Sequence, residues 1–195
     1  MKQCVISLAT EGGDFQKGIE RLQKSLKRIR FQGDFISWKG SYPQGCPFHL
    51  EAPMAFKPFC FVEAKRMGYD LILWVDASGV VIRPLEPIFR AIAQEGYVFF
   101  KNTSCILGEW CSDEALALSG MTRDEALELP EANSAAVGLN MQSEAAAEFL
   151  KRWYAKAVDG VTFRGTREEL KDRDDYLAVK WNKGGRVSNH PRVYG

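Results

Sequence analysis

An aspartate directly follows a strongly apolar segment of this chain. Residues 71–75 read Leu-Ile-Leu-Trp-Val, and Asp76, Ala77 and Ser78 come next. The pattern predicts a buried strand, which places Asp76 at its carboxyl end, where open α/β sheets bind their ligands. A partly buried carboxylate is costly unless it is paired or bound to a metal. Asp76 therefore either caps the turn toward Gly79 or contributes its charge to a binding site, and spacing alone leaves both interpretations open.

Lys57 is a second candidate for a binding site. It precedes Pro58, which suits the first residue of a helix because its missing N–H would be unpaired there anyway. A helix N-terminus favours anions, so Lys57 and this N-terminus could together neutralise a phosphate. Arg83 is a weaker candidate for the same role. Lys57 is equally compatible with a solvated lysine on the surface.

The segments that must position these residues alternate between strand and helix patterns. Ile19, Leu22, Leu26 and Ile29 line one face of a helix, and Gly68 suits the left-handed end of another. The predicted strands are residues 4–9, 34–38, 70–75, 97–100 and 135–141, and the predicted helices lie near 19–29, 58–68, 88–92, 114–118 and after Ser143. Residues 40–55 are expected to form a loop. This alternation predicts an α/β fold with a mostly parallel central sheet flanked by helices.

The composition is that of an ordinary globular protein. The chain has 195 residues, of which 46% are hydrophobic and 26% charged, and this predicts a single domain over residues 1–195. The net charge of +1 argues against nucleic acid as a general partner, since such binding needs a basic excess. No apolar run approaches the roughly 20 residues of a membrane span. The composition does not indicate an oligomeric state.

The five cysteines predict a reduced, cytoplasmic protein. They are odd in number and form no CxxC pair, and Cys4 and Cys60 lie among apolar residues, as small buried hydrophobes do. A zinc site is not expected, because the two histidines, His49 and His190, lack ligand-like neighbours at zinc-site spacing. The apolar run that begins at Cys4 is too short for a secretory signal.

Residues 54–89 closely resemble the central block of GT-A-type glycosyltransferases, in the nucleotide-diphospho-sugar transferase superfamily. In that block a Lys-Pro helix leads into a strand that ends, here at residues 74–78, in Trp-Val-Asp-Ala-Ser. A helix near Leu-Glu-Pro-Ile-Phe, here residues 85–89, then follows. Residues 136–140, Ala-Val-Gly-Leu-Asn, resemble the family's next strand and its loop on the sugar side. The resemblance covers most of residues 1–160 and implies one GT-A-like domain with a Rossmann-like sheet.

This resemblance implies transfer of a sugar from a nucleotide-diphosphate-sugar donor to a carbohydrate or another hydroxyl acceptor. The donor would lie beside a divalent metal, Mn²⁺ or Mg²⁺, and a UDP-sugar is favoured over a GDP-sugar. Asp76 matches the first position of the family's Asp-x-Asp metal motif and would be the catalytic carboxylate, whereas Ser78 stands at the last position as a weaker, neutral ligand. The residues expected to bind the donor are Thr10, Glu11, Lys57 and Ala77.

Two further groups of polar residues have both a functional and a structural interpretation. Thr10 and Glu11 follow the first strand, where this fold receives the base and ribose, but the glycines after them also suit an ordinary turn. Glu109, Asp113 and Glu131 are weaker candidates for a general base. They fit an acidic, solvated loop better.

The end of the chain resembles the approach to a family segment of the type His-Arg-His-Asp-Gln, whose histidine commonly completes the metal site. We expect that the chain stops before this segment and is a truncated domain with weak metal affinity. His190 could substitute for the missing histidine ligand only if the tail folds back. Two alternatives stay open. One is a non-catalytic nucleotide-sugar-binding domain. The other is a haloacid-dehalogenase-type phosphatase, which is disfavoured because its Asp-x-Asp follows the first strand.

Overall fold

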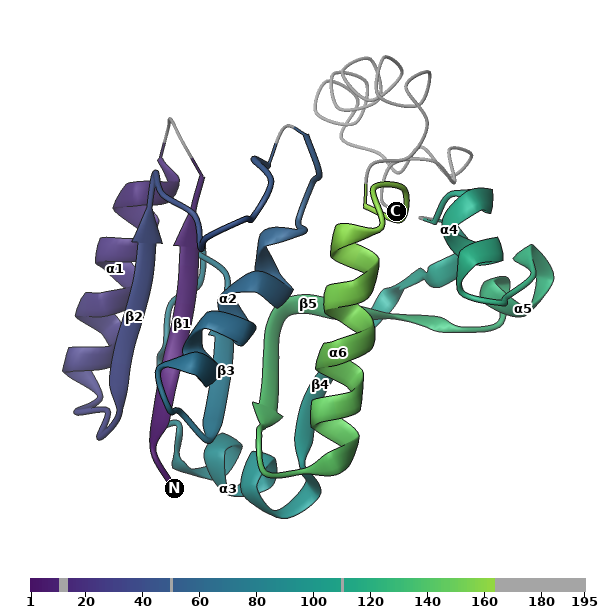
Figure 1. Ribbon diagram of the computed structural model, residues 1–195. Coiled ribbons are helices and arrows are strands. Elements are labelled where there is room, and N and C mark those ends of the chain that lie inside the picture. Colours follow the sequence, from purple (N-terminus) through teal and green to yellow (C-terminus); the bar gives the residue numbers. More distant parts are fainter. Residues whose placement is uncertain (11–13, 50, 110, 164–195) are drawn as a thin grey trace.

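The computed structural model describes residues 1–10, 14–49, 51–109 and 111–163, with the backbone alone for residues 103 and 104. Strands and helices alternate along most of this length (Figure 1). In chain order the elements are β1 (Gln3–Ala9), α1 (Phe15–Arg28), β2 (Asp34–Lys39), α2 (Phe56–Arg66), β3 (Leu71–Val75), α3 (Glu86–Glu95), β4 (Tyr97–Ile106), the 3-10 turn η1 (Leu107–Glu109), α4 (Asp113–Leu118), α5 (Arg123–Leu127), β5 (Pro130–Asn140) and α6 (Glu144–Val158). None of the helices in these ranges is long and apolar enough to cross a lipid bilayer.

The strands form one sheet in the order β2-β1-β3-β5-β4. β1 is parallel to both β2 and β3, whereas β5 is antiparallel to β3 and to β4. Four of the five strands in the described sheet therefore run in one direction, which confirms the predicted α/β fold with a mostly parallel central sheet flanked by helices. Because β5 is reversed, its Ala136 pairs with Val75 at the carboxyl end of β3.

Helices cover the two faces of the sheet in pairs. Ile72 and Trp74 of β3 pack into the cluster formed with α2 and α6, whereas Leu71 and Leu73 pack into the cluster formed with α1 and α3. Figure 1 shows α2 and α6 side by side on the same face of the sheet. The strands are therefore apolar on both faces, as expected for a sheet buried between two layers.

This alternation also fixes the direction of Asp76. Successive side chains of a strand point to opposite faces, so a residue two positions beyond Trp74 returns to the face covered by α2. The carboxylate of Asp76 does reach the indole of Trp74 on this side, where Trp74 Nε1 donates to Asp76 Oδ1 at 2.6 Å. β3 thus places Asp76, the residue that follows it, beside the first turn of α2.

Several boundaries differ from the sequence prediction. α2 begins at Phe56, so Pro58 is its third residue and not its first. The missing N–H of Pro58 still falls in the first turn, where N–H groups have no partner within the helix. Gly68 and Gly96 follow α2 and α3 with φ of 83° and 87°, the left-handed conformation expected where a helix ends at glycine.

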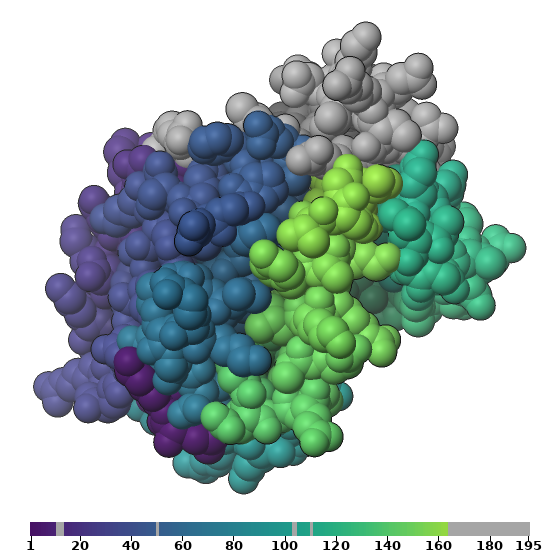
Figure 2. All heavy atoms as spheres, viewed as in Figure 1, coloured from purple at the N-terminus to yellow at the C-terminus, as the bar shows by residue number. Residues whose placement is uncertain are grey.

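The largest difference lies in the segment between β4 and β5. Only a short helix was expected there, but β4 and β5 extend as a paired ribbon whose tip carries η1, α4 and α5. The pairing has register shifts after Phe99 and after Lys101, which blur the alternation of apolar residues. In the space-filling view the ribbon tip forms a lobe beside α6 (Figure 2), and Lys156 of α6 donates to the carbonyl of Leu118 in α4.

Candidate functional site

A pocket opens at the carboxyl ends of β1 and β3. It has a volume of about 90 Å³ for the centres of water-sized molecules and lies open to solvent on one side. Most of its wall is apolar or aromatic, and its polar groups belong to a few side chains. The residues that line it are Leu8, Thr10, Phe15, His49, Met54, Phe56, Trp74, Asp76, Ala77 and Ser78. The structure therefore brings together four of the predicted site residues, from two strands that are distant in sequence.

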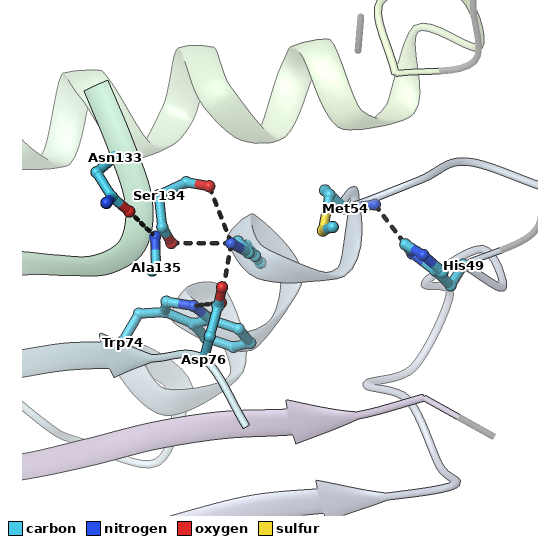
Figure 3. A network of polar contacts seen from close by, with 8 residues as sticks. His49, Met54, Trp74, Asp76, Asn133, Ser134 and Ala135 are labelled. Carbon is cyan, nitrogen blue, oxygen red and sulfur yellow. Dashed lines mark hydrogen bonds and ion pairs between the residues drawn. The ribbon is translucent and has the colours of Figure 1, made fainter. Parts of the chain in front are cut away.

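Asp76 is the acidic group of this pocket. Its side chain is 33% exposed, and its Oδ1 accepts from Trp74 Nε1 at 2.6 Å and contacts Lys57 Nζ at 3.0 Å (Figure 3). The turn after it is closed by main-chain atoms, because Gly79 N–H donates to the Asp76 carbonyl at 2.7 Å. The carboxylate is thus held by a cation and an indole, and the turn does not depend on it as a cap.

Lys57 is the buried partner of this carboxylate. Its side chain is only 2% exposed, although the surface interpretation predicts a solvated lysine. An ammonium group has three N–H donors, and Nζ has three acceptors within 3.0 Å: Asp76 Oδ1, the Ser134 carbonyl and Ser134 Oγ. Burial lowers the pKa of Lys57 from its ordinary value of 10.5, and the Asp76 charge opposes that shift.

Ser134 completes this arrangement from β5. Asp76 N–H donates to the Ala135 carbonyl at 2.8 Å, and Asn133 Oδ1 accepts from Ala135 N–H at 2.8 Å (Figure 3). These contacts tie the amino-terminal half of β5 to the end of β3. The resemblance assigned residues 136–140 to a strand and its loop on the sugar side, but these residues all lie within β5, and Asn140 pairs with Leu71 at the opposite end of β3. The antiparallel direction of β5 is the reason, and sequence alone gave no signal for Ser134.

The oxygen donors at this site are few, but their chemistry fits a divalent cation. Asp76 Oδ1 is already engaged by Lys57 and Trp74, which leaves Oδ2 and the nearby hydroxyl of Ser78. Mg²⁺ is usually bound through one or two carboxylates together with substrate phosphates and water, so one carboxylate can suffice when a diphosphate is present. Among the described residues there is no group of three or more His, Cys, Asp or Glu side chains that could hold a metal.

The loop before α2 contributes a strained residue to the pocket wall. Met54 has a φ of 65°, a left-handed conformation that is uncommon for residues other than glycine. Its N–H donates to His49 Nδ1 at 3.2 Å, and both side chains line the pocket (Figure 3). Such conformations cost about 1–3 kcal/mol and cluster at ligand sites. Neither residue was predicted from the sequence to belong to the site, although His49 is one of only two histidines.

Gly18 lets α1 approach the turn that carries Ala77 and Ser78. A Cβ at this buried position would lie 2.3 Å from the Ala77 carbonyl oxygen. The sequence signal was a glycine inside an otherwise regular amphipathic helix, where glycine normally costs about 1 kcal/mol relative to alanine. Close packing is the reason that the helix tolerates it.

We expect Gly18→Ala to destabilise the protein by about 1–2 kcal/mol. Overpacking costs about 1–3 kcal/mol, and the higher helix propensity of alanine offsets up to about 1 kcal/mol of this loss. Urea unfolding followed by circular dichroism measures the change. Gln23→Ala, at an exposed position of the same helix, is the matched control and should not lose stability. A stabilised Gly18→Ala protein would contradict the close packing.

The other predicted residues lie away from the pocket or beyond the described chain. Asp113 pairs with Arg123, and Glu131 accepts from Asn102, both on the β4–β5 extension with Glu109. None of these three acidic residues lines the pocket. Glu11 and His190 lie outside the described residues, so their predicted roles stay predictions. Cys4 and Cys60 are buried free thiols, as expected from their apolar neighbours.

Comparisons with known proteins add a likeness of fold. No protein-family model and no curated protein sequence matches the chain. A similar solved structure is a glycosyltransferase involved in the glycosylation of the major capsid of PBCV-1, with 13% identity and a TM-score of 0.47 over 82% of this chain and 68% of the other. A second is 4-diphosphocytidyl-2C-methyl-D-erythritolsynthase from Anaerococcus prevotii DSM 20548, with 10% identity and a TM-score of 0.43 over 91% and 98% of the two chains.

A third similar structure is the glycosyltransferase GlyE of Streptococcus pneumoniae TIGR4, with 16% identity and a TM-score of 0.36. The match covers 98% of this chain but 42% of GlyE, so this chain spans less than half of that protein. Likeness at these levels does not assign an activity to this chain.

Proposed function

We propose that the chain is the donor-binding core of a glycosyltransferase, and that its pocket at the ends of β1 and β3 binds a nucleotide-diphosphate-sugar. The observation that carries the proposal is the position of Asp76. Its carboxylate borders the pocket at the carboxyl end of a central strand, with one oxygen held by Lys57 and Trp74. This is where open α/β sheets bind nucleotides, and the surrounding residues resemble the GT-A block.

The proposed mode of binding follows from the two kinds of wall in this pocket. The apolar and aromatic side chains suit the face of a nucleobase, and we place a uracil there in preference to guanine. The diphosphate then lies toward Asp76, with the hydroxyl of Ser78 as a hydrogen-bond donor. We place the hydroxyl of Thr10 as a second donor to it, although the resemblance assigned Thr10 to the base and ribose. A divalent metal held by Asp76 and Ser78 would act as a Lewis acid that neutralises the leaving diphosphate.

Lys57 has a supporting role in this proposal. The sequence suggested that it neutralises the diphosphate directly, but its three donors are matched by Asp76 and Ser134. We infer that Lys57 acts through Asp76 by fixing the direction of the carboxylate and cancelling much of its charge. A metal then meets little net negative charge until the diphosphate arrives, so nucleotide and metal should bind together.

Calorimetry of UDP binding tests this proposal. With Mn²⁺ present we expect a dissociation constant between about 1 and 100 µM, and without metal we expect binding at least about tenfold weaker, since couplings of 5–150-fold between sites are typical. Mn²⁺ alone should bind weakly. GDP should bind less tightly than UDP in the same titration. If neither nucleotide binds with or without metal, the proposal is wrong.

A second candidate function is a non-catalytic nucleotide-sugar-binding domain. The observation that favours it is Ser78, a neutral hydroxyl at the position where the family's motif has its second carboxylate. Hydrolysis of a UDP-sugar by the purified chain separates the two functions. Release of UDP that requires Mn²⁺ and is lost in Asp76→Asn supports the enzyme. Tight UDP binding without any release supports the binding domain.

A further inference from the structure

One flank of α1 carries a stripe of cations. Lys17, Arg21, Lys24 and Arg28 follow one another at spacings of four, three and four, which places them on one side of the helix. Two of them locate this side in the fold. Arg21 Nη2 donates to the Ser78 carbonyl at 2.7 Å, and Arg28 Nη2 donates to the Val81 carbonyl at 3.2 Å. The stripe therefore lies along the loop that follows β3.

This loop exposes apolar side chains beside the stripe. Ile82 is 75% exposed and Val80 is 43% exposed, while Val81 between them is buried and its N–H donates to Ser25 Oγ at 3.0 Å. The buried Val81 anchors the loop to α1, so that its neighbours are presented outward. Arg83 is also exposed and adds a cation next to Ile82. A single exposed apolar residue is ordinary, but two beside a stripe of cations form a surface that is both apolar and positively charged.

Four of the five cations of α1 belong to this stripe, and the fifth, Lys27, borders it. Glu20 borders the stripe as well, three residues after Lys17 and four before Lys24. Its carboxylate pairs with Lys39 of β2 at 3.6 Å. Within the stripe, Lys17 forms an ion pair with Asp14 at 2.9 Å. The whole chain has a net charge of only +1, so this concentration of cations is a local feature and not an overall excess.

We propose that this surface docks the protein onto a lipid bilayer that contains anionic phospholipids. We call it the α1 surface; it consists of Lys17, Arg21, Lys24, Arg28, Val80, Ile82 and Arg83. Cations near an anionic leaflet are attracted to its headgroups, and small apolar side chains among them enter the interface between headgroups and acyl chains. A nucleic acid would need no exposed Ile82 or Val80, and aliphatic side chains do not provide the aromatic stacking that single strands use.

Docking of this kind would bring the pocket close to the membrane. Arg21 holds the carbonyl of Ser78, and Ser78 lines the pocket. The α1 surface and the pocket therefore share a turn, and the pocket would lie beside the headgroups when the surface is docked. The docking itself requires neither nucleotide nor metal, so it stands or falls separately from the proposed function.

Vesicle sedimentation tests the α1 surface directly. The full chain is mixed with phosphatidylcholine vesicles that either contain or lack phosphatidylserine, and the bound fraction is measured. We expect binding only with phosphatidylserine, and weaker binding at high salt because salt screens exposed charges. Lys24→Gln should lower the partition coefficient about five-fold, since each cation near an anionic surface contributes to that extent. Ile82→Ser should also lower it, because it removes the apolar side chain that enters the interface.

Lys65→Gln is the matched control, because Lys65 is exposed on α2, which covers the opposite face of the sheet from α1. It should change the partition coefficient by less than about two-fold. All three positions are exposed, so these variants should keep the parental melting curve. Three outcomes would overturn the proposal: no binding to either vesicle, equal loss in Lys65→Gln and Lys24→Gln, or tighter binding to a single-stranded RNA homopolymer that Ile82→Ser leaves unchanged. The last would identify a nucleic-acid surface.

Discussion

Asp76→Asn is expected to abolish metal-coupled binding of UDP. Asparagine has nearly the same shape, so Trp74 can still donate to the side-chain oxygen, but the negative charge and the proposed metal ligand are lost. Substitution of groups that only support metal ligands costs about 10–100-fold. Loss of the ligand itself should therefore weaken binding of UDP with Mn²⁺ by roughly 100-fold or more.

The same substitution should destabilise the fold. It leaves the ammonium of Lys57, 2% exposed, without its counter-charge. Removal of one partner from a buried ion pair costs about 3–5 kcal/mol, and since Asp76 is one-third exposed we expect a smaller loss of about 2–4 kcal/mol. Burial lowers the pKa of Lys57, and the charge of Asp76 opposes that shift. Asp76→Asn removes this opposing charge, so the pKa of Lys57 should fall further.

Calorimetry and urea unfolding of the same preparation separate these two effects. Asp124→Asn, at an exposed position of α5, is the control for loss of one negative charge and should keep parental binding. Its stability should change by less than about 1 kcal/mol, the usual limit for a charge in the first turn of a helix. An Asp76→Asn protein that is folded and binds UDP with Mn²⁺ like the parent would show that Asp76 is not part of the site.

Lys57→Met is expected to cost about 3 kcal/mol of stability but to tighten the binding of Mn²⁺ alone. Methionine keeps an unbranched chain in the same buried space while it removes the charge and all three N–H donors. The carboxylate of Asp76 is then unpaired. Breaking a buried pair costs about 3–5 kcal/mol, and the lower end of this range applies because water reaches the one-third-exposed Asp76. The same unpaired carboxylate carries a full negative charge toward the pocket, so the repulsion between Lys57 and a metal no longer opposes binding.

The double variant Lys57→Met with Asp76→Asn distinguishes a structural pair from a direct ligand. Replacement of both partners of a buried pair is often close to neutral, so the double variant should recover most of the stability lost in either single variant. It should not recover binding of UDP with Mn²⁺. If Lys57→Met leaves Mn²⁺ affinity unchanged and weakens UDP binding without metal, Lys57 contacts the diphosphate directly and the supporting role is wrong.

The sequence was sufficient to predict most of the sheet and the position of Asp76. Residues 71–75 are apolar on both faces, so a central strand and an aspartate at its tip followed from the pattern alone. α1 and the left-handed glycine after α2 were equally predictable, because amphipathic periodicity and helix ends are local properties. These features depend on neighbours within a few residues of the chain.

The partners of Asp76 could not be predicted in the same way. The contact between Lys57 and Asp76 depends on where α2 begins and on how it packs over β3. Ser134 reaches Lys57 because β5 runs antiparallel to β3. The apolar pattern of a strand does not indicate its direction in the sheet, so this contact could not be predicted. The β4–β5 extension was missed for a related reason, since its pairing is long-range and its register shifts interrupt the alternation.

A crystal structure of the chain with UDP and Mn²⁺, with diffraction data collected at the manganese absorption edge, tests the central claim most directly. We expect the diphosphate to lie in the pocket between Thr10 and Ser78, and an anomalous peak for manganese beside the oxygen of Asp76 that does not contact Lys57. UDP bound outside this pocket, or a manganese peak distant from Asp76, would contradict the proposed site.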